Sequence, residues 1–336
     1  MSNILDIIIP MYNTPKEYIS RALTSISRQK NVDFNEIGVI LIDDASTKIK
    51  YKKSYFKQCF PKLNITLLQN KVNSGAGVTR QNGIDASTAE YVTFLDSDDE
   101  FYGNEALYKV IALMKDEQFS TDRIQTAFYE EIKDDLGNII KIRHGVEFSC
   151  LHGYFVKKSL LDKYNLRFHP TLRYHEDSYF ISITKNLSLD SFIYFDEVTY
   201  LWKWNDNSLV RTLDLKKDAE NFKYRFQSTV ASCDFLSNYD IDIREKTIID
   251  ANYMAMLLCS NQFDEENHLL IKEEYTKQLY DFVIKYNIFD EIGSKNNDII
   301  QKNLETVRRS YDWLVITHSI DEFMNDLKNK YWKSNN

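Results

Sequence analysis

Three carboxylates within four residues are the strongest chemical signal in this sequence. Asp96, Asp98 and Asp99 follow the stretch 91–95, whose aromatic and β-branched residues indicate a buried strand. Carboxylates gathered at one strand end repel each other unless a cation lies among them. Hard oxygen ligands suit Mg²⁺ or Mn²⁺, and such an ion would bind a substrate diphosphate. The alternative is a solvated acidic turn, because D-x-D alone is a weak motif.

A second polar group consists of His175, Glu176 and Asp177, directly before an amphipathic segment. One of these carboxylates can accept the proton of an attacking hydroxyl, and general-base help is worth about 10²–10⁴-fold in rate. A simple helix start is the competing interpretation, since acidic residues near an N-terminus interact favourably with the helix dipole. Spacing alone does not separate the two.

A glycine-bearing segment, 73–77, precedes Arg80. Its two glycines permit a tight backbone beside a phosphate or ribose, and Arg80 can pair with phosphate. A glycine turn before a helix is common, so this segment is weak evidence by itself.

The elements that must position these residues alternate between strand and helix over the first hundred residues. Buried strands are predicted at 4–9, 37–42, 65–68 and 91–95, with helices after residue 15 and at 78–87. Thr14, Pro15 and Glu17 supply start signals for the first helix, with Thr14 and Glu17 as a capping box. This order predicts parallel pairing with right-handed crossovers, hence an α/β sheet.

Ligands bind beyond the carboxyl ends of the strands in such sheets. The residues expected there are Tyr12, Asn13, Asp43, Asp44 and the acidic residues 96–99. Three separate strands therefore deliver polar or acidic groups to one edge of the sheet.

The pattern weakens after residue 104. Helices are predicted at 105–117, 156–165 and 175–186, and strands at 124–131, 139–142 and 192–203. Glycine and proline almost vanish from about Leu215 onward. A long amphipathic helix is predicted there from apolar residues at helical spacing, namely Ile299, Ile300, Leu304, Val307, Tyr311 and Leu314. We therefore predict a catalytic domain over residues 1–214 and a mainly helical region over residues 215–336.

Read together, these motifs resemble the inverting family 2 glycosyltransferases with a GT-A fold. The matching stretches are 7–13, 42–46, 73–82, 94–99, 153–157, 166–168 and 176–180, in the family's order and spacing. The resemblance covers about residues 4–210. It implies a Rossmann-like, mostly parallel sheet flanked by helices, with the helical C-terminal region as an appendage.

The resemblance also implies roles for individual residues. Those implied for nucleotide-sugar binding are Pro10, Tyr12, Asp44, Arg80, Asp96 and Ser97. Tyr12 would lie against a uracil base and Asp44 would hydrogen-bond the edge of that base. Arg80 would position the base or the phosphates, and Asp96 would lie near the ribose or the metal.

Asp98 would be the principal ligand of Mn²⁺ or Mg²⁺, and Asp177 would be the general base that activates the acceptor hydroxyl. Glu176, His175 and Lys203 are further candidates for the site. Inversion by a single in-line displacement needs one base and no covalent nucleophile, which agrees with the lack of a Ser-His or Cys-His arrangement.

Two features depart from the family pattern. The stretch 200–208 lacks the histidine that many relatives have before a serine, and Lys203 stands in place of an arginine. Trp202 and Trp204 in the same stretch can stack on a sugar or pack in the core. The helical C-terminal region is the second departure.

Composition narrows the classes of partner. A net charge of −8, from 42 basic and 50 acidic residues, argues against a nucleic-acid-binding protein, which needs a basic surface. Four cysteines without metal-site spacing fit a reducing cytoplasm. Neither a signal peptide nor a membrane-spanning stretch is expected. We predict a cytoplasmic enzyme, with contact at the inner membrane face as an alternative.

The predicted reaction is transfer from a UDP-sugar to a hydroxyl of a glycan, teichoic acid or other polymer acceptor. Transfer to a protein or a modified nucleic-acid base is one alternative, and a non-catalytic glycan-binding protein on the same fold is another. A sugar-nucleotide-forming nucleotidyltransferase would need a glycine-rich loop after its first strand, where residues 10–13 have none.

The helical C-terminal region could form a homodimer, bind the acceptor or contact a membrane. Trp332 with Lys328, Lys330 and Lys333 is the basis for the membrane alternative.

Overall fold

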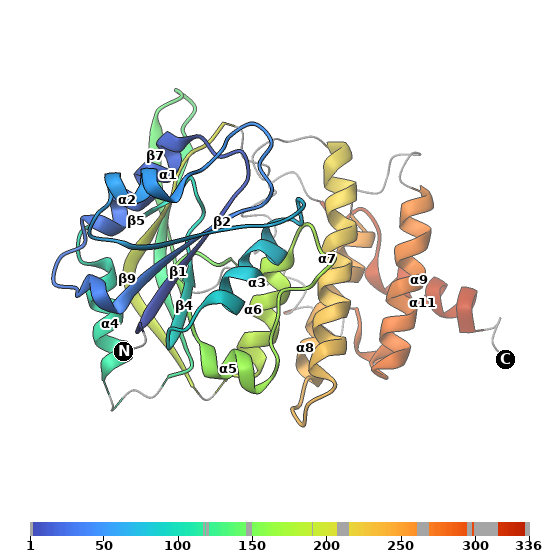
Figure 1. The fold of residues 1–336 in the computed structure, drawn as a ribbon. Helices are drawn as coiled ribbons and strands as arrows, with labels where there is room; N and C mark the ends of the chain where they lie inside the picture. The colour runs from blue at the N-terminus through green and yellow to red at the C-terminus, as the bar shows by residue number, and fades with distance from the viewer. Residues whose placement is uncertain are drawn as a thin grey trace. The chain divides into compact units, whose positions relative to one another are not determined.

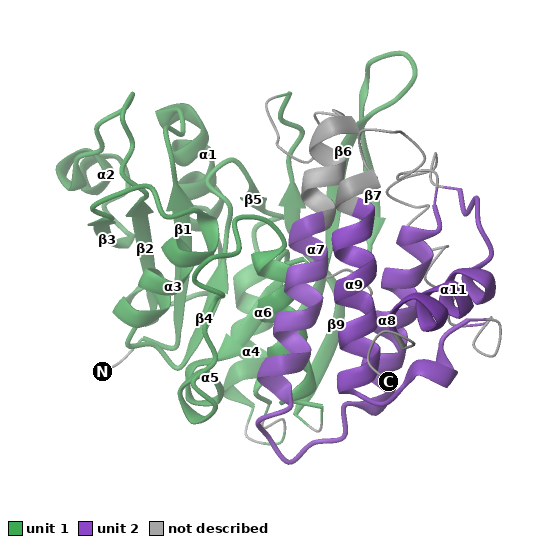
Figure 2. Cartoon of the chain, turned by 90° about the vertical axis from the view of Figure 1, so that its right-hand side faces the viewer, with its two compact units in different colours: residues 1–212 green, residues 213–336 purple. Residues whose placement is uncertain are grey.

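A computed structural model describes residues 3–116, 118, 121–145, 150–189, 191–206, 215–260, 269–293, 298 and 315–332. The chain divides into two compact units, residues 1–212 and residues 213–336 (Figure 2). The first unit is built on one nine-stranded sheet, and the second consists of helices (Figure 1).

Four parallel strands form one half of the sheet. They are β1 (Leu5–Met11), β2 (Ile37–Asp43), β3 (Asn64–Gln69) and β4 (Tyr91–Phe94). The central strand β1 pairs with β2 on one side and with β4 on the other, and β3 pairs with β2. All seven residues of β2 are buried, which is why its sequence is a continuous apolar run instead of an alternating one.

The other half of the sheet is mixed. Its strands are β5 (Glu100–Phe101), β6 (Arg123–Lys133), β7 (Ile139–His144), β8 (Tyr154–Lys157) and β9 (Phe192–Trp202). The strand order is β3-β2-β1-β4-β8-β6-β9-β5, and β7 pairs with β6. Strand β8 runs antiparallel to both β4 and β6, whereas β9 runs parallel to β6. The predicted α/β sheet flanked by helices is confirmed.

The helices of the first unit cover the sheet (Figure 1). They are α1 (Lys16–Ser27), α2 (Lys53–Cys59), α3 (Ala76–Ala86), α4 (Ala106–Lys115), α5 (Lys158–Lys163) and α6 (Glu176–Asn186), with a 3₁₀ turn η1 (Phe34–Glu36). Helix α1 buries Ile19, Ala22, Leu23 and Ile26 against the core, as their spacing predicts.

Two local predictions were wrong. The segment 156–165 is not one helix, because β8 occupies its first residues and α5 begins at Lys158. Thr14 does not cap α1, which has no side-chain cap. Its hydroxyl lies 2.9 Å from the Ser97 hydroxyl instead, so it ties the segment after β1 to the acidic loop, residues 96–99.

The second unit contains α7 (Leu215–Leu236), α8 (Arg244–Leu258), α9 (Leu269–Lys285), η4 (Phe289–Glu291) and α11 (Ile320–Trp332). Its core includes Phe226, Met254, Leu279 and Met324. Among the described residues the unit is helical except for an isolated bridge between Ser260 and Ile316. The amphipathic helix predicted around residues 299–314 lies outside the described residues. No helix in the described ranges is long and apolar enough to span a bilayer.

Candidate active site

The acidic loop follows β4, at the carboxyl end of the parallel strands. Asp96 and Asp98 are partly buried, whereas Asp99 is only 2% exposed. The backbone N–H of Asp99 donates to the carbonyl of Asp96, which makes residues 96–99 a turn. This is the edge at which the sequence predicted a cluster of carboxylates.

The end of β9 holds this loop in place. Asp98 accepts a hydrogen bond from the Asn205 amide at 2.8 Å. Asp99 accepts one from the Tyr200 hydroxyl at 2.6 Å and another from the backbone N–H of Lys203 at 2.8 Å. Burial raises the pKa of Asp98, and burial with the charges of Asp98 and Asp96 raises that of Asp99 well above its ordinary value.

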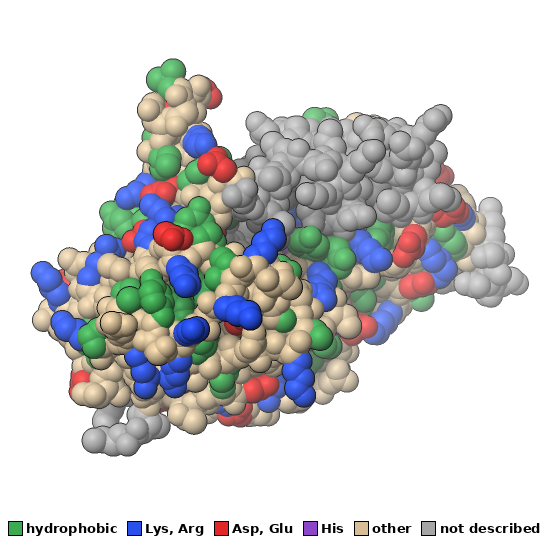
Figure 3. Space-filling view, turned by 45° about the horizontal axis from the view of Figure 1, so that its top comes forward, with side chains coloured by type: hydrophobic (Ala, Val, Ile, Leu, Met, Phe, Trp, Pro, Cys, Tyr) green, Lys and Arg blue, Asp and Glu red, His purple; other side chains and the backbone are tan. Residues whose placement is uncertain are grey.

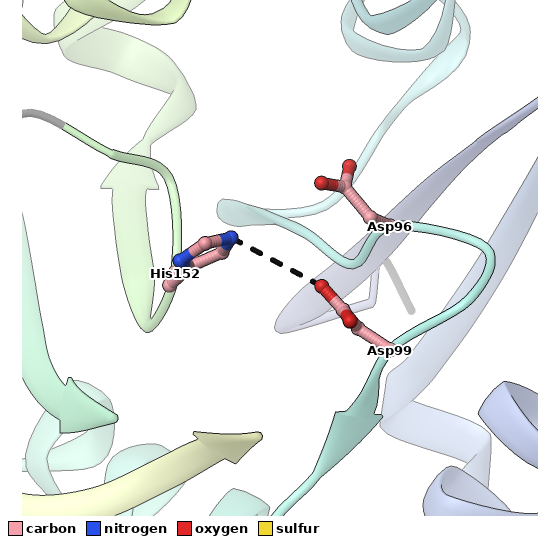
Figure 4. Close-up of side chains that lie close together, drawn as sticks. All are labelled: Asp96, Asp99 and His152. Atoms are coloured by element: carbon pink, nitrogen blue, oxygen red, sulfur yellow. Dashed lines mark ion pairs between the residues drawn. The ribbon is translucent and has the colours of Figure 1, made fainter. Parts of the chain in front are cut away.

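His152, two residues before β8, completes a group of three side chains with Asp96 and Asp99 (Figure 4). One ligand atom from each lies within 4.8 Å of the others, and His152 Nε2 lies 4.0 Å from an Asp99 oxygen. The imidazole packs on Tyr200 and Trp202, with ring centroids 4.6 and 4.9 Å away. Burial lowers its pKa to about 4, so the ring is neutral at neutral pH.

The sequence analysis did not single out His152. It directly precedes the Gly153–Lys157 motif, but a lone histidine has no spacing signal, and only the pairing of β8 with β4 brings it to the acidic loop. Its Nδ1 atom is buried and has no hydrogen-bond partner among the described residues, which is unusual for a polar atom in a folded protein.

Arg80 connects the acidic loop to the second predicted group. This side chain on α3 donates from Nη2 to Asp96 at 2.7 Å and from Nη1 to Glu176 at 2.9 Å. Burial opposes its charge, but the two carboxylates outweigh burial and raise its pKa. The guanidinium in turn outweighs the effect of burial on Asp96 and lowers the pKa of that carboxyl. Arg80 therefore bridges the buried carboxylate of Glu176 and the partly buried carboxylate of Asp96.

Glu176 and Asp177 form the first turn of α6, as predicted. His175 precedes them in a left-handed conformation, with φ 57°, and contributes no side-chain cap. Burial and the charge of Asp177 raise the pKa of Glu176 to about 7. Asp177 Oδ1 accepts the N–H of Ser178 at 2.7 Å, and burial raises the Asp177 pKa. Glu176 is thus held in an ion pair with Arg80, and Asp177 is held in the first turn of α6.

The remaining predicted residues lie in different environments. Tyr12 is 50% exposed directly after β1, where it can face a ligand, and Pro10 lies within β1. Asp44 is buried and accepts the backbone N–H groups of Ser74 and Gly75, both at 2.8 Å. It thereby holds the glycine-bearing segment in front of α3.

Lys203 pairs with Glu131 at 2.8 Å, and the backbone N–H of Trp204 also donates to Glu131. These contacts fix the loop that follows β9, whose Asn205 reaches Asp98. Trp202 packs against the core cluster and His152, which favours the packing interpretation for this tryptophan.

The candidate site lies at the carboxyl edge of an α/β sheet, the edge at which such folds bind their ligands. Acidic groups suited to a cation lie beside a carboxylate suited to accept a proton. Residues 6–168 match the family described as glycosyl transferase family 2. The chain therefore carries a glycosyl transferase family 2 domain with the predicted GT-A fold, and the protein is a glycosyltransferase.

Individual proteins extend the comparison. The uncharacterised glycosyltransferase EpsJ of Bacillus subtilis is 23% identical over 261 residues, 72% of each chain. The poly(ribitol-phosphate) β-N-acetylglucosaminyltransferase TarS of Staphylococcus aureus is 35% identical over 119 residues, 34% of this chain and 19% of TarS.

Solved structures share the fold. Residues 1–349 of TarS in complex with UDP-GlcNAc superpose with a TM-score of 0.66 at 20% identity, covering 93% of this chain and 92% of the TarS chain. The mannosyltransferase PcManGT of Pyrobaculum calidifontis, in complex with GDP-Man and Mn²⁺, has a TM-score of 0.53 at 13% identity and covers 99% of this chain and 88% of its own.

Proposed function

We propose that this protein is an inverting glycosyltransferase that moves a sugar from a UDP-sugar to a hydroxyl of a cell-surface polymer such as a teichoic acid or polysaccharide. The observation that carries the proposal is the Arg80 bridge, which joins the acidic loop to the helix start that presents Asp177. The UDP-GlcNAc bound by TarS supports a uridine nucleotide as the donor. Its activity on poly(ribitol-phosphate), given by its name, supports a polymeric acceptor.

A divalent cation fits the acidic loop. Carboxylate oxygens of Asp96 and Asp99 suit Mn²⁺ or Mg²⁺, and the neutral imidazole of His152 offers a nitrogen that Mn²⁺ accepts more readily than Mg²⁺. Asp98 is in the same loop but outside this group of three, and its carboxylate accepts a hydrogen bond from Asn205. Asp98, with support from the other three, would hold the ion. When bound, the cation neutralises the diphosphate that leaves.

Asp177 is proposed to take the proton. One of its oxygens, Oδ1, is held by the Ser178 N–H, which orients the carboxylate. A bond forms between the acceptor oxygen and the anomeric carbon, the bond from that carbon to the diphosphate breaks, and the hydroxyl proton moves to Asp177. Arg80 holds Glu176 and Asp96 at fixed positions. The positions of Tyr12 and Asp44 are consistent with a uracil pocket beyond β1 and β2.

Release of UDP from a panel of UDP-sugars, with and without Mn²⁺, tests this function. We expect turnover of at least one UDP-sugar, which Asp177→Asn lowers by about 10²–10⁴-fold without weakening UDP binding. Asp162→Asn, at an exposed carboxylate of α5, is the matched control and should keep wild-type turnover. Full turnover in Asp177→Asn would refute its role as base, and turnover of only non-uridine donors would refute the proposed donor class.

The roles of residues 213–336 in dimer formation, acceptor binding or membrane contact stay predictions. Lys328 and Lys330, which suggested membrane contact, pair with Asp290 and Glu273 within the second unit.

A further inference from the structure

A pocket of about 600 Å³ lies in the first unit, away from the acidic loop. It forms where β5, the N-terminus of α4 and the bulged part of β9 meet β6 and β7. Tyr102 and Tyr129 line it together with Lys109, Arg143 and Glu197. Its volume is within the range of about 300–1,000 Å³ that is usual for small-molecule sites.

An irregularity in the sheet shapes one wall of this pocket. The register between β6 and β9 passes from Thr126 opposite Phe195 to Ala127 opposite Val198. Two residues, Asp196 and Glu197, therefore lie outside the ladder. Bulges of this kind redirect side chains, and here both carboxylates line the pocket.

Charged partners fix these two carboxylates. Lys109 Nζ lies 2.6 Å from Glu197, and Arg143 pairs with Asp196. The pocket lining also contains one further lysine and one further glutamate, so its basic and acidic groups balance. A balanced lining gives no net attraction for a polyanion such as a phosphate chain, but it offers hydrogen-bond donors and acceptors to hydroxyl groups. On the face of the molecule drawn in Figure 3, Lys and Arg side chains lie among uncharged and hydrophobic ones, with fewer Asp and Glu side chains between them.

The two tyrosines add apolar surface. The rings of Tyr102 and Tyr129 meet edge to face, with centroids 4.9 Å apart, and neither phenol hydroxyl forms a hydrogen bond with a described residue. A tyrosine that combines an apolar ring with an unpartnered hydroxyl suits a ligand with both C–H and O–H groups. Sugar rings have this chemistry.

A strip of polar residues leads from the pocket to the acidic loop. Tyr129 and Glu131 are two residues apart on β6 and so share one face of the sheet. Glu131 binds Lys203 and the Trp204 N–H, and the next residue, Asn205, donates to Asp98. These contacts link one wall of the pocket to the acidic loop.

We propose that this pocket is a distal subsite for a neutral, hydroxyl-rich saccharide unit of the acceptor polymer. The proposal rests on the proposed function, in the case in which the acceptor is a polysaccharide. Tyr102 and Tyr129 would select neutral sugar units by packing against them. The bulge residues Asp196 and Glu197 would form hydrogen bonds with the hydroxyl groups of the sugar. A phosphate-bearing unit gains no net electrostatic attraction there, because the basic and acidic groups of the lining balance.

Affinity gel electrophoresis tests the subsite. The wild-type protein runs through native gels that contain dextran, hydroxyethyl cellulose or galactomannan as neutral probes, or inorganic polyphosphate as the anionic probe. We expect retardation by at least one neutral polymer. Tyr102→Ala and Tyr129→Ala should each weaken that binding about tenfold. Tyr108→Ala is the matched control, since this 44%-exposed tyrosine on α4 is outside the pocket lining, and it should behave as wild type.

Three results would overturn the proposal: no retardation by any neutral polymer, equal retardation of wild type and both pocket variants, or retardation by polyphosphate alone. The thermal stability of the same proteins with UDP and Mn²⁺ distinguishes a failure of the subsite from a failure of the proposed function. Stabilisation by UDP without neutral-polymer binding would remove the subsite and leave the donor site in place. Circular dichroism of each variant shows whether its fold is intact.

Discussion

Arg80 offers the sharpest physical test of the site. Its side chain is 8% exposed and binds two carboxylates, of which Glu176 is 11% exposed and Asp96 is 37% exposed. Arg80→Met removes the cation and leaves both acids without their partner. Breaking a buried ion pair in this way costs about 3–5 kcal/mol, whereas an exposed pair is worth about 0–1 kcal/mol.

The loss in the free energy of unfolding caused by Arg80→Met should depend on pH. At pH 8 Glu176 is ionised, so the full penalty is expected, while at pH 5 it is protonated because its pKa is about 7, and the penalty should fall. Urea unfolding at both pH values measures this. Arg167→Met is the control, because Arg167 lies 3.9 Å from Asp85 at the surface and should cost less than about 1 kcal/mol at either pH.

A double variant isolates the interaction. Arg80→Met with Glu176→Gln removes one buried charge along with the cation, so it should recover part of the loss at pH 8. A cost no larger than that of Arg167→Met, or a cost that does not change between pH 5 and pH 8, would refute the reasoning about the bridge.

Three further predictions follow from individual contacts. Because the pKa of Glu176 is raised to about 7, the folded state binds this proton more tightly than the unfolded state does. The free energy of unfolding should therefore fall as the pH rises from about 4.5 to 7. Urea unfolding of Glu176→Gln should show that fall reduced by about 1–3 kcal/mol. Gly153→Ala would place a methyl group 2.1 Å from the Thr126 hydroxyl oxygen, at a residue with φ +66°, and should lower the free energy of unfolding by about 2–4 kcal/mol. Gly137→Ala also lies at positive φ but meets nothing within 4 Å, so it should lower that free energy by only about 1–2 kcal/mol. Asp44→Ala would leave two loop N–H groups without an acceptor, so it should cost about 2–4 kcal/mol and weaken UDP binding; unchanged UDP affinity would contradict its proposed place beside the donor.

Much of the sheet was predictable because each buried parallel strand is a short apolar run that ends in polar residues. The segment 37–42 predicted β2 within one residue, and 192–203 predicted β9 equally well. The start of α6 was also predictable, because acidic residues precede an amphipathic segment. These signals are local, so a single sequence contains them.

Contacts between distant residues were not predictable in the same way. Strand β8 has four residues and merges with the helical pattern of α5, so its antiparallel pairing has no local signature. His152 joins Asp99 only through that pairing. Arg80 was expected to pair with phosphate, but its partners lie 16 and 96 residues away in the sequence, and no spacing rule encodes them.

The central claim is a metal-assisted uridine-nucleotide site at the acidic loop. The most direct measurement is thermal stability with UDP, GDP, CDP and ADP, each with and without Mn²⁺, on wild type and on Asp98→Ala. We predict that UDP with Mn²⁺ at about 100 times its Kd raises the midpoint of wild type by about 5–10 °C, that the other nucleotides do less, and that Asp98→Ala abolishes the shift. Equal shifts with all four nucleotides, or an undiminished UDP shift in Asp98→Ala, would contradict the account.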